Sequence, residues 1–310
     1  MATPPRPAFE AAMATTLQKT CYHYLQHGLT HLLAPNQTEG DLLQAILNVQ
    51  GAFEAVSKLQ ELKSAGWTAI VEDKHHDWSD ARLLKALDEG KLKTVRYEQS
   101  KTSLLTRKGI PKDQQDMIQK LQRLRNSIAH LGLPQLPVTA REEITILTVR
   151  VLNEWVWEIR PKAKEGPYLQ NQARMVLDGH LFQKLKSDPI YESEAMELAY
   201  EKGEKVRRCP ECKVEAWAVL REDNDELFCF CCGYQAVSQM ISFGNCPVCS
   251  EHDFLYDAMN WHGGNPVGGT CLDCWQHLEV RVCGWCNNVS INNRQQSCPG
   301  CNVPYQQPQQ

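Results

Sequence analysis

Six Cys-x-x-Cys pairs are the residues of this sequence best suited to chemistry. Of the 14 cysteines in the 310 residues, 13 lie between Cys209 and Cys301. A Cys-x-x-Cys turn directs two thiolates at one ion, and two such turns close a tetrahedral site of four sulfurs around Zn²⁺. The spacing therefore predicts metal ligation. The predicted ligands are Cys209, Cys212, Cys229, Cys232, Cys246, Cys249, Cys271, Cys274, Cys283, Cys286, Cys298 and Cys301.

Joining consecutive pairs predicts about three structural zinc sites. The loops inside the three units have 16, 21 and 11 residues, which suits a hairpin, so each unit resembles a zinc ribbon. A crossed arrangement of the pairs is an alternative. Cys231 falls outside the Cys-x-x-Cys spacing and is interpreted as a buried or reactive spare. Four thiolates leave a metal no open position, so these sites should not activate water.

Disulfides and iron–sulfur centres are the alternatives to zinc. A dense disulfide framework is typical of secreted chains, but the first 16 residues hold one Arg and no apolar core of signal-peptide type. Thiolates are soft enough to hold iron as well as zinc. Zinc remains the favoured interpretation.

A second motif lies at the end of the helix predicted over residues 113–131, where Arg125 and Asn126 are followed by His130. Arginine is a permanent bidentate donor to phosphate, and histidine titrates near neutral pH. Together these groups could do acid–base chemistry beside a bound phosphate. The alternative is that these residues have no catalytic role. They would then form a solvated flank of the helix, with a cationic histidine near its C-terminus.

At this point the chain resembles the HEPN superfamily, whose signature is an Arg, a polar residue and a His within a helical bundle. The matching segment is Leu124–Gly132, LRNSIAHLG. The resemblance implies a metal-independent endoribonuclease in which His130 exchanges protons with the 2′-hydroxyl and the leaving oxygen, while Arg125 holds the phosphate. It also implies a cleft shared by two chains, and a role in a toxin or antiphage defence system. A HEPN-like fold that binds RNA or nucleotides without cutting is a further alternative.

Helix geometry constrains this site. At about 100° per residue, positions 125 and 130 lie about 140° apart around the helix axis. One straight helix does not direct both side chains at one phosphate. Either the helix frays at His130 or two chains share the site, and the resemblance favours the second. Asn126, four residues before His130, could orient the imidazole.

The elements around these motifs predict a multidomain protein. Apolar periodicity indicates an all-α bundle over residues 1–165, HEPN-like by the resemblance, with helices near 8–34, 38–64, 80–87, 113–131 and 139–159. Residues 166–207 are interpreted as a helical connector. Residues 208–301 are predicted to be a small β module of three tandem zinc ribbons, and residues 302–310 a disordered tail.

Charge limits the choice of partners. Residues 208–310 hold 5 Lys and Arg against 11 Asp and Glu, a net charge of −6, whereas residues 1–207 have a net charge of +2. No apolar run approaches the roughly 18 residues of a membrane span. We therefore expect a cytoplasmic protein without membrane contact. The HEPN resemblance implies RNA as its substrate and a second copy of the chain as a partner. A protein partner on the acidic ribbons is a further prediction.

Weaker patterns are interpreted as structural. His23, His27 and His31 recur every fourth residue, but no carboxylate shares their spacing, which favours a polar face over a metal site. Cys21 has no feature of a nucleophile.

The sequence thus predicts a homodimeric endoribonuclease with Arg125, Asn126 and His130 in its site, whose zinc ribbons position RNA or a partner. The rival hypothesis is a non-enzymatic adaptor, in which the bundle dimerises and the ribbons recognise a protein or nucleic acid.

Overall fold

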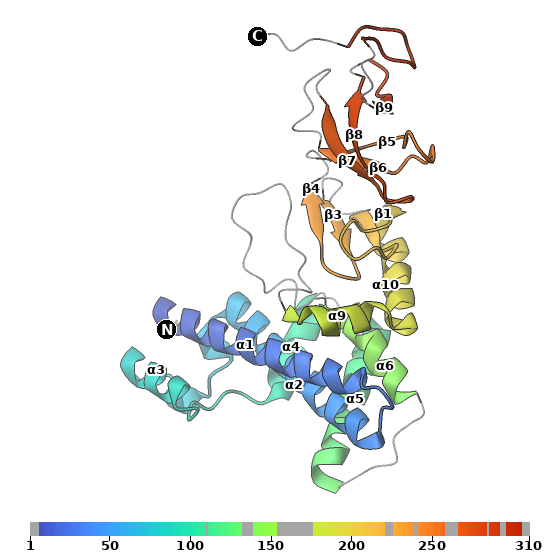
Figure 1. The fold of residues 1–310 in the computed structure, drawn as a ribbon. Coiled ribbons are helices and arrows are strands. Elements are labelled where there is room, and N and C mark those ends of the chain that lie inside the picture. The colour runs from blue at the N-terminus through green and yellow to red at the C-terminus, as the bar shows by residue number, and fades with distance from the viewer. Residues whose placement is uncertain are drawn as a thin grey trace. The chain divides into compact units, whose positions relative to one another are not determined.

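A computed structural model describes most of the chain, in two compact units that we treat separately (Figure 1). The first unit consists of Met1–Pro161 and Ala173–Tyr191, and the second of Lys162–Gln172 and Glu192–Gln310. The described residues are 6–108, 111–131, 139–153, 176–220, 226–237, 241–257, 266–283, 285–291 and 296–305.

The first unit is helical, as the apolar periodicity predicts. Short 3₁₀ turns lie at Trp67–Ala69 and Asp73–His75, and a π turn at Thr148–Asn153 follows α6. The helices are α1 (Pro7–Leu32), α2 (Glu39–Ala65), α3 (Asp80–Asp88), α4 (Tyr97–Lys108), α5 (Lys112–Leu131), α6 (Ala140–Leu147) and α9 (Gly179–Lys186). Among the described helices, none combines the length and apolar character needed to cross a lipid bilayer.

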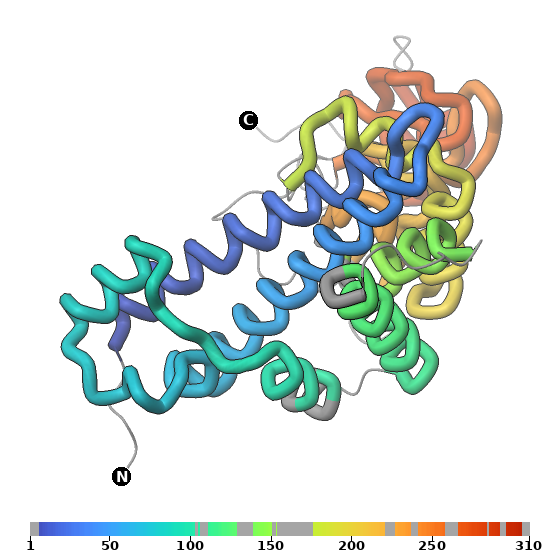
Figure 2. Tube along the Cα trace, turned by 90° about the horizontal axis from the view of Figure 1, so that it is seen from below, coloured from blue at the N-terminus to red at the C-terminus, as the bar shows by residue number. Residues whose placement is uncertain are grey.

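The pair α1 and α2 forms the centre of this unit, and Figure 2 shows the two helices side by side. Small residues permit the close approach. A Cβ on Gly28 would lie 3.0 Å from Val49 Cγ2, and one on Gly51 would lie 3.0 Å from the Tyr24 ring. Phe9 and Phe53 are fully buried in this core. Because α2 contacts α1, α4 and α5, it buries residues around most of its circumference.

The start of α2 is fixed by a reciprocal cap. The Thr38 hydroxyl accepts a hydrogen bond from the Asp41 backbone N–H at 3.2 Å, and the Asp41 carboxylate accepts one from the Thr38 N–H at 3.0 Å. Such a capping box satisfies two backbone donors that the helix itself cannot pair. Hydrogen bonds from the Thr38 side chain and from His31 lower the pKa of Asp41 to about 2.

This cap predicts a pH dependence for the helical unit. Because the folded pKa of Asp41 is about 2 and its ordinary value is 3.8, its stabilising effect is complete above the ordinary value and disappears as the pH falls through 2. We expect Asp41→Asn to lower the melting temperature of the helices at pH 6, and the difference from wild type to vanish toward pH 2. Circular dichroism at both pH values measures this. An equal difference at both would contradict it.

The second unit contains two antiparallel meanders, which follow α10 (Pro189–Lys202) in the chain. Consecutive strands pair in each sheet, in the orders β1-β2-β3-β4 and β5-β6-β7-β8-β9. The strands are β1 (Gly203–Arg207), β2 (Trp217–Leu220), β3 (Glu226–Cys229), β4 (Gln235–Val237), β5 (Ile241–Gly244), β6 (Phe254–Asp257), β7 (Val267–Cys271), β8 (His277–Val282) and β9 (Val289–Ile291).

Alternating strand direction determines where the cysteine turns lie. In a meander, every second strand runs in the same direction. The C-terminal ends of β1 and β3 therefore lie on the same side of the first sheet, and those of β5 and β7 lie on the same side of the second. A Cys-x-x-Cys turn follows each of these four strands. The turn after β8 lies at the opposite ends of the strands, because β8 is antiparallel to β7.

Arg207 joins the two sheets. Its guanidinium forms an ion pair with Asp253, donates to the His252 carbonyl at 3.1 Å, and lies 4.0 Å from the Phe243 ring centre. Trp217 of the first sheet also contacts Phe243, with ring centres 6.0 Å apart. The two meanders therefore share a packed contact within the second unit.

Two predicted boundaries need correction. Residues 203–207, assigned from sequence to a helical connector, form β1 and pair with β2, because the meander requires this strand beside Trp217. Residues 302–305, assigned to a disordered tail, are held by a bridge between Ser297 and Pro304 and by a 2.6 Å hydrogen bond between Ser290 and Tyr305. The remainder of that tail, and the end of the helix predicted over residues 139–159, lie outside the described residues.

Tight packing in the second sheet predicts a contrast between adjacent glycines. A Cβ on Gly269 would lie 2.3 Å from the ring of fully buried Phe254, whereas one on Gly268 meets no atom closer than His277 Nε2 at 3.9 Å. We expect Gly269→Ala to destabilise the sheet by about 1–3 kcal/mol and Gly268→Ala to change stability by less than about 1 kcal/mol. Hydrogen exchange of the β6–β8 amides in each variant measures this. Equal protection in the two variants would show that the contact is wrong.

Candidate functional site

Three groups of four cysteines come together in the second unit, and each is built from two consecutive Cys-x-x-Cys turns. Within each group the sulfur atoms all lie within 4.8 Å of one another. This arrangement confirms the predicted pairing and excludes the crossed alternative. The groups are Cys209, Cys212, Cys229 and Cys232; Cys246, Cys249, Cys271 and Cys274; and Cys283, Cys286, Cys298 and Cys301.

The distances between sulfurs fit a shared ion. Across the turns, Cys209 and Cys232 lie 3.7 Å apart, Cys249 and Cys271 3.6 Å, and Cys286 and Cys298 3.6 Å. Four sulfurs at about 2.3 Å from a tetrahedral ion are separated by about 3.8 Å, whereas a disulfide requires about 2.05 Å. Disulfide bonding is therefore excluded within these pairs, and each group could hold one metal ion.

All six turns have the same backbone conformation. In each, the N–H of the first cysteine donates to the carbonyl five residues ahead, and its own carbonyl accepts from the N–H four residues ahead. In the turn at Cys246, for example, these partners are Glu251 at 2.7 Å and Ser250 at 2.9 Å. The residue directly after the second cysteine always has a positive φ, between 54° and 73°. These residues are Lys213, Gly233, Ser250, Trp275, Asn287 and Asn302.

Three of these six positions carry neither glycine nor asparagine, and a left-handed conformation costs such residues roughly 1–2 kcal/mol. These turns therefore hold their shape against local preference. Metal ligation would compensate for this cost, because binding at such sites contributes directly to folding.

Backbone N–H groups prepare one thiol in the second and third groups for ligation. Burial alone would raise the pKa of Cys246, but the N–H groups of Cys249 and Val248 outweigh it and lower the pKa to about 7. The N–H groups of Cys301 and Gly300 likewise overcome burial and lower the pKa of Cys298 to about 6. Since the thiolate is the ligand form, a metal ion that enters either group would meet a sulfur that is at least partly ionised at neutral pH.

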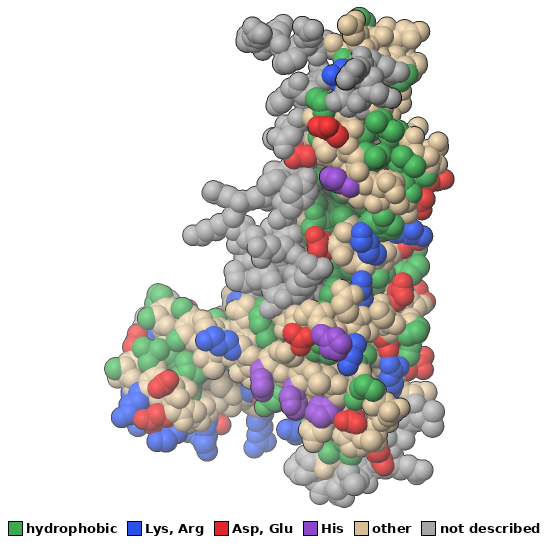
Figure 3. All heavy atoms as spheres, in the orientation of Figure 1, with side chains coloured by type: hydrophobic (Ala, Val, Ile, Leu, Met, Phe, Trp, Pro, Cys, Tyr) green, Lys and Arg blue, Asp and Glu red, His purple; other side chains and the backbone are tan. Residues whose placement is uncertain are grey.

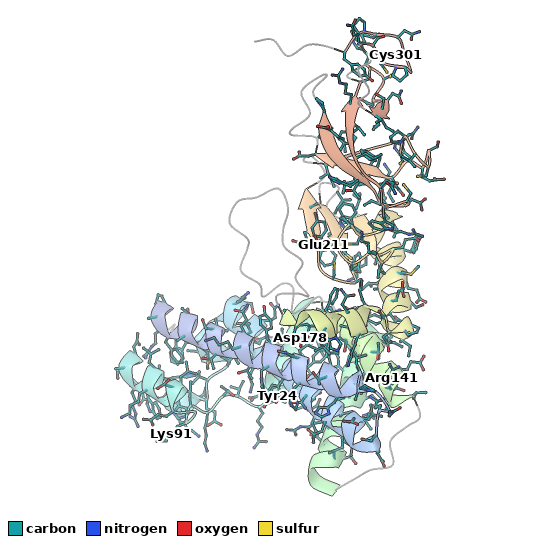
Figure 4. All side chains as sticks on the ribbon, in the orientation of Figure 1. Tyr24, Lys91, Arg141, Asp178, Glu211 and Cys301 are labelled. Atoms are coloured by element: carbon teal, nitrogen blue, oxygen red, sulfur yellow. The ribbon has the colours of Figure 1, made fainter. Side chains whose placement is uncertain are left out.

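The cysteines become more exposed from the first group to the third. All four cysteines of the first group are buried, whereas Cys286 of the third group is exposed. Figure 4 labels Glu211 in the first turn and Cys301 in the last. With four thiolates, none of these groups leaves an ion an open position, so the arrangement supports structure and not catalysis.

The two remaining cysteines lie outside the groups. Cys231 is buried beside the first group but is not one of its four. Cys21 of α1 is fully buried, and burial raises its pKa to about 12. Such a thiol remains protonated at neutral pH and is not a nucleophile.

The first group predicts a contrast between adjacent cysteines. We expect Cys232→Ser to remove one bound ion per chain and expose β1–β4 to protease, because one lost thiolate opens the tetrahedral site. The matched variant Cys231→Ser should keep the full metal content. Inductively coupled plasma mass spectrometry with limited proteolysis measures both. Metal loss in Cys231→Ser with retention in Cys232→Ser would reverse the assignment.

The predicted catalytic residues lie on α5. The Arg125 guanidinium donates to the Asn126 side-chain oxygen at 3.1 Å; Arg125 is partly exposed and Asn126 is exposed. The His130 side chain lies outside the described residues, although the helical backbone continues through Leu131. The backbone therefore gives no support for fraying at His130.

A groove of about 400 Å³ lies between α5 and α6. Its lining includes the apolar Met117, Leu124 and Ile144, together with Arg123 and the ion pair between Lys120 and Glu143. Neither Arg125 nor Asn126 lines this groove. The sequence alone does not identify it, because α6 completes it.

No family model matches this chain, and no curated protein or solved structure is significantly similar to it. The chain is therefore placed in no family by comparison. The HEPN resemblance depends on the short segment at the end of α5.

Proposed function

We propose that this protein is a homodimeric, metal-independent endoribonuclease of HEPN type, and that zinc fills its three four-cysteine groups. The observation that carries the proposal is the LRNSIAHLG segment, within which α5 presents the partly exposed Arg125 next to the exposed Asn126. A partly exposed arginine that is held by a neighbouring amide is positioned for a phosphate.

The chemistry assigns one task to each side chain. Arg125 holds the non-bridging phosphate oxygens through bidentate hydrogen bonds. His130 removes the proton from the 2′-hydroxyl, whose oxygen attacks phosphorus, and then gives that proton to the 5′-oxygen of the next nucleotide as its bond to phosphorus breaks. Asn126 orients the reacting groups. The products are a cyclic phosphate and a free 5′-hydroxyl.

A continuous α5 favours a site that two chains share. Since positions 125 and 130 lie about 140° apart around the axis, Arg125 of one chain and His130 of a second copy meet most readily where two α5 helices cross near these residues. Position 126 lies between them in angle, on the face that such a crossing requires.

Zinc fits the cysteine groups best. Sulfur separations of 3.6–3.8 Å match tetrahedral zinc, which has no redox chemistry to disturb a structural role. Each filled group has a formal charge of −2, in a region of residues 208–310 that already has a net charge of −6. Such a module does not attract phosphates by bulk charge.

The acidity of the ribbons favours a protein partner for them. Trp285 and Val248, which lie within two of the turns, are 73% and 55% exposed, and exposed aromatic residues are enriched at protein interfaces. The exposure of Trp285 and Val248 also supports the second candidate function, a non-enzymatic adaptor. A role in antiphage defence or as a toxin follows only from the HEPN resemblance.

Cleavage of RNA in the presence of EDTA tests the catalytic proposal. We expect the wild-type protein to cut total RNA and His130→Ala to lose at least 100-fold in rate, as removal of a general acid–base predicts. His180→Ala, which changes an exposed histidine of α9, is the control and should cut normally. Mapping of the new RNA ends identifies the cyclic phosphate. A folded, dimeric wild-type protein that does not cut would favour the adaptor.

Mixing two inactive variants tests the shared site. If Arg125 and His130 of one site come from different chains, exchange between Arg125→Ala and His130→Ala chains rebuilds one intact site in each mixed dimer. Random exchange should then restore about a quarter of the wild-type sites. No restoration, with exchange verified by native mass spectrometry, would place both residues of a site in one chain.

A further inference from the structure

A row of histidines follows one face of α1, and Figure 3 shows these side chains in line along the helix. His23 and His27 are exposed, and the His31 side chain is 28% exposed. A spacing of four residues places two imidazoles on one helical face, as in helical zinc sites that use a His-x-x-x-His pair. The ring spacing decides which pair can share an ion.

Only one of the two pairs has the spacing that a metal requires. The ring centres of His27 and His31 are 5.0 Å apart, whereas those of His23 and His27 are 6.1 Å apart. With metal–nitrogen bonds of about 2.0–2.1 Å, a bound imidazole centre lies about 3.2 Å from the ion, so two such centres are about 4.5–5.2 Å apart at octahedral or tetrahedral angles. The pair His27 and His31 fits this range, and His23 does not.

A carboxylate from the next helix orients one of these rings. The His31 Nδ1 lies 3.0 Å from Asp41 Oδ1. Asp41 is itself fixed by the reciprocal cap with Thr38. Histidines that bind metals commonly donate their second ring N–H to a carboxylate, which fixes the tautomer and the ring orientation. The Nε2 atom of His31 is then the one left for an ion.

We propose that His27 and His31 form a binding site for a late first-row divalent cation, such as Zn²⁺ or Ni²⁺, and that Asp41 is its positioning residue. Imidazole nitrogen favours these ions over Mg²⁺ and Ca²⁺, which prefer oxygen. Two protein ligands leave several coordination positions to water. This site is therefore open and exchangeable, in contrast to the closed four-cysteine groups.

An ion at this site would hold the end of α1 to the start of α2. An ion on His27 and His31 links successive turns of α1 and, through Asp41, the start of α2. Because such an ion binds the folded unit and not the unfolded chain, it should raise the melting temperature of the helices. This site is independent of the proposed ribonuclease activity.

Calorimetric titration of Zn²⁺ into the full-length protein, with its cysteine groups already saturated, tests the proposal. We expect one further equivalent in the wild type, its loss in His27→Ala and in His31→Ala, and a 10- to 100-fold weaker affinity in Asp41→Asn, as removal of such a carboxylate typically produces. His23→Ala is the matched control and should bind as the wild type does.

A second measurement separates ligation from unfolding. All variants should keep the wild-type helical circular dichroism, and nitrogen-15 spectra should show Zn²⁺ shifting the imidazoles of His27 and His31 and leaving His23 unchanged. The proposal is overturned if the wild type takes up no further equivalent. It is equally overturned if His23→Ala weakens binding as much as His27→Ala does.

Discussion

The repulsion among four thiolates is the constraint on which the second unit depends. Sulfur atoms that lie within 4.8 Å of one another would repel once ionised, and a divalent ion at their centre turns this repulsion into attraction. An ion bound in such a group would fix two turns and the strands that lead into them. Both meanders are short, and the core of β5–β9 consists mainly of valines, aromatic rings and the cysteines themselves. Metal ligation would supply stability that so small a core lacks.

This constraint separates structure from chemistry within the chain. The cysteine groups are closed and acidic, so they suit a rigid platform and not a reaction. The candidate catalytic residues lie on α5 of the helical unit, where Arg125 and Asn126 are accessible. The helical unit obtains its stability from packing, for example through the close approach at Gly28 and Gly51.

Local sequence signals predicted most of this arrangement. The Cys-x-x-Cys spacing identified the 12 cysteines that come together in three groups, because each turn is built from neighbouring residues. Features that depend on distant residues were not predictable. Asp41 shares no spacing with His31 in sequence, and only the turn between α1 and α2 brings them together. Residues 203–207 have no strand periodicity of their own and form β1 because β2 offers a partner.

Native mass spectrometry of the intact wild-type chain tests the central claim most directly. The account predicts a mass that exceeds that of the fully reduced polypeptide by three zinc ions, less the protons that they displace, with no loss of hydrogen to disulfides. A chain that carries no metal and is lighter by two hydrogens for each pair of cysteines would contradict it.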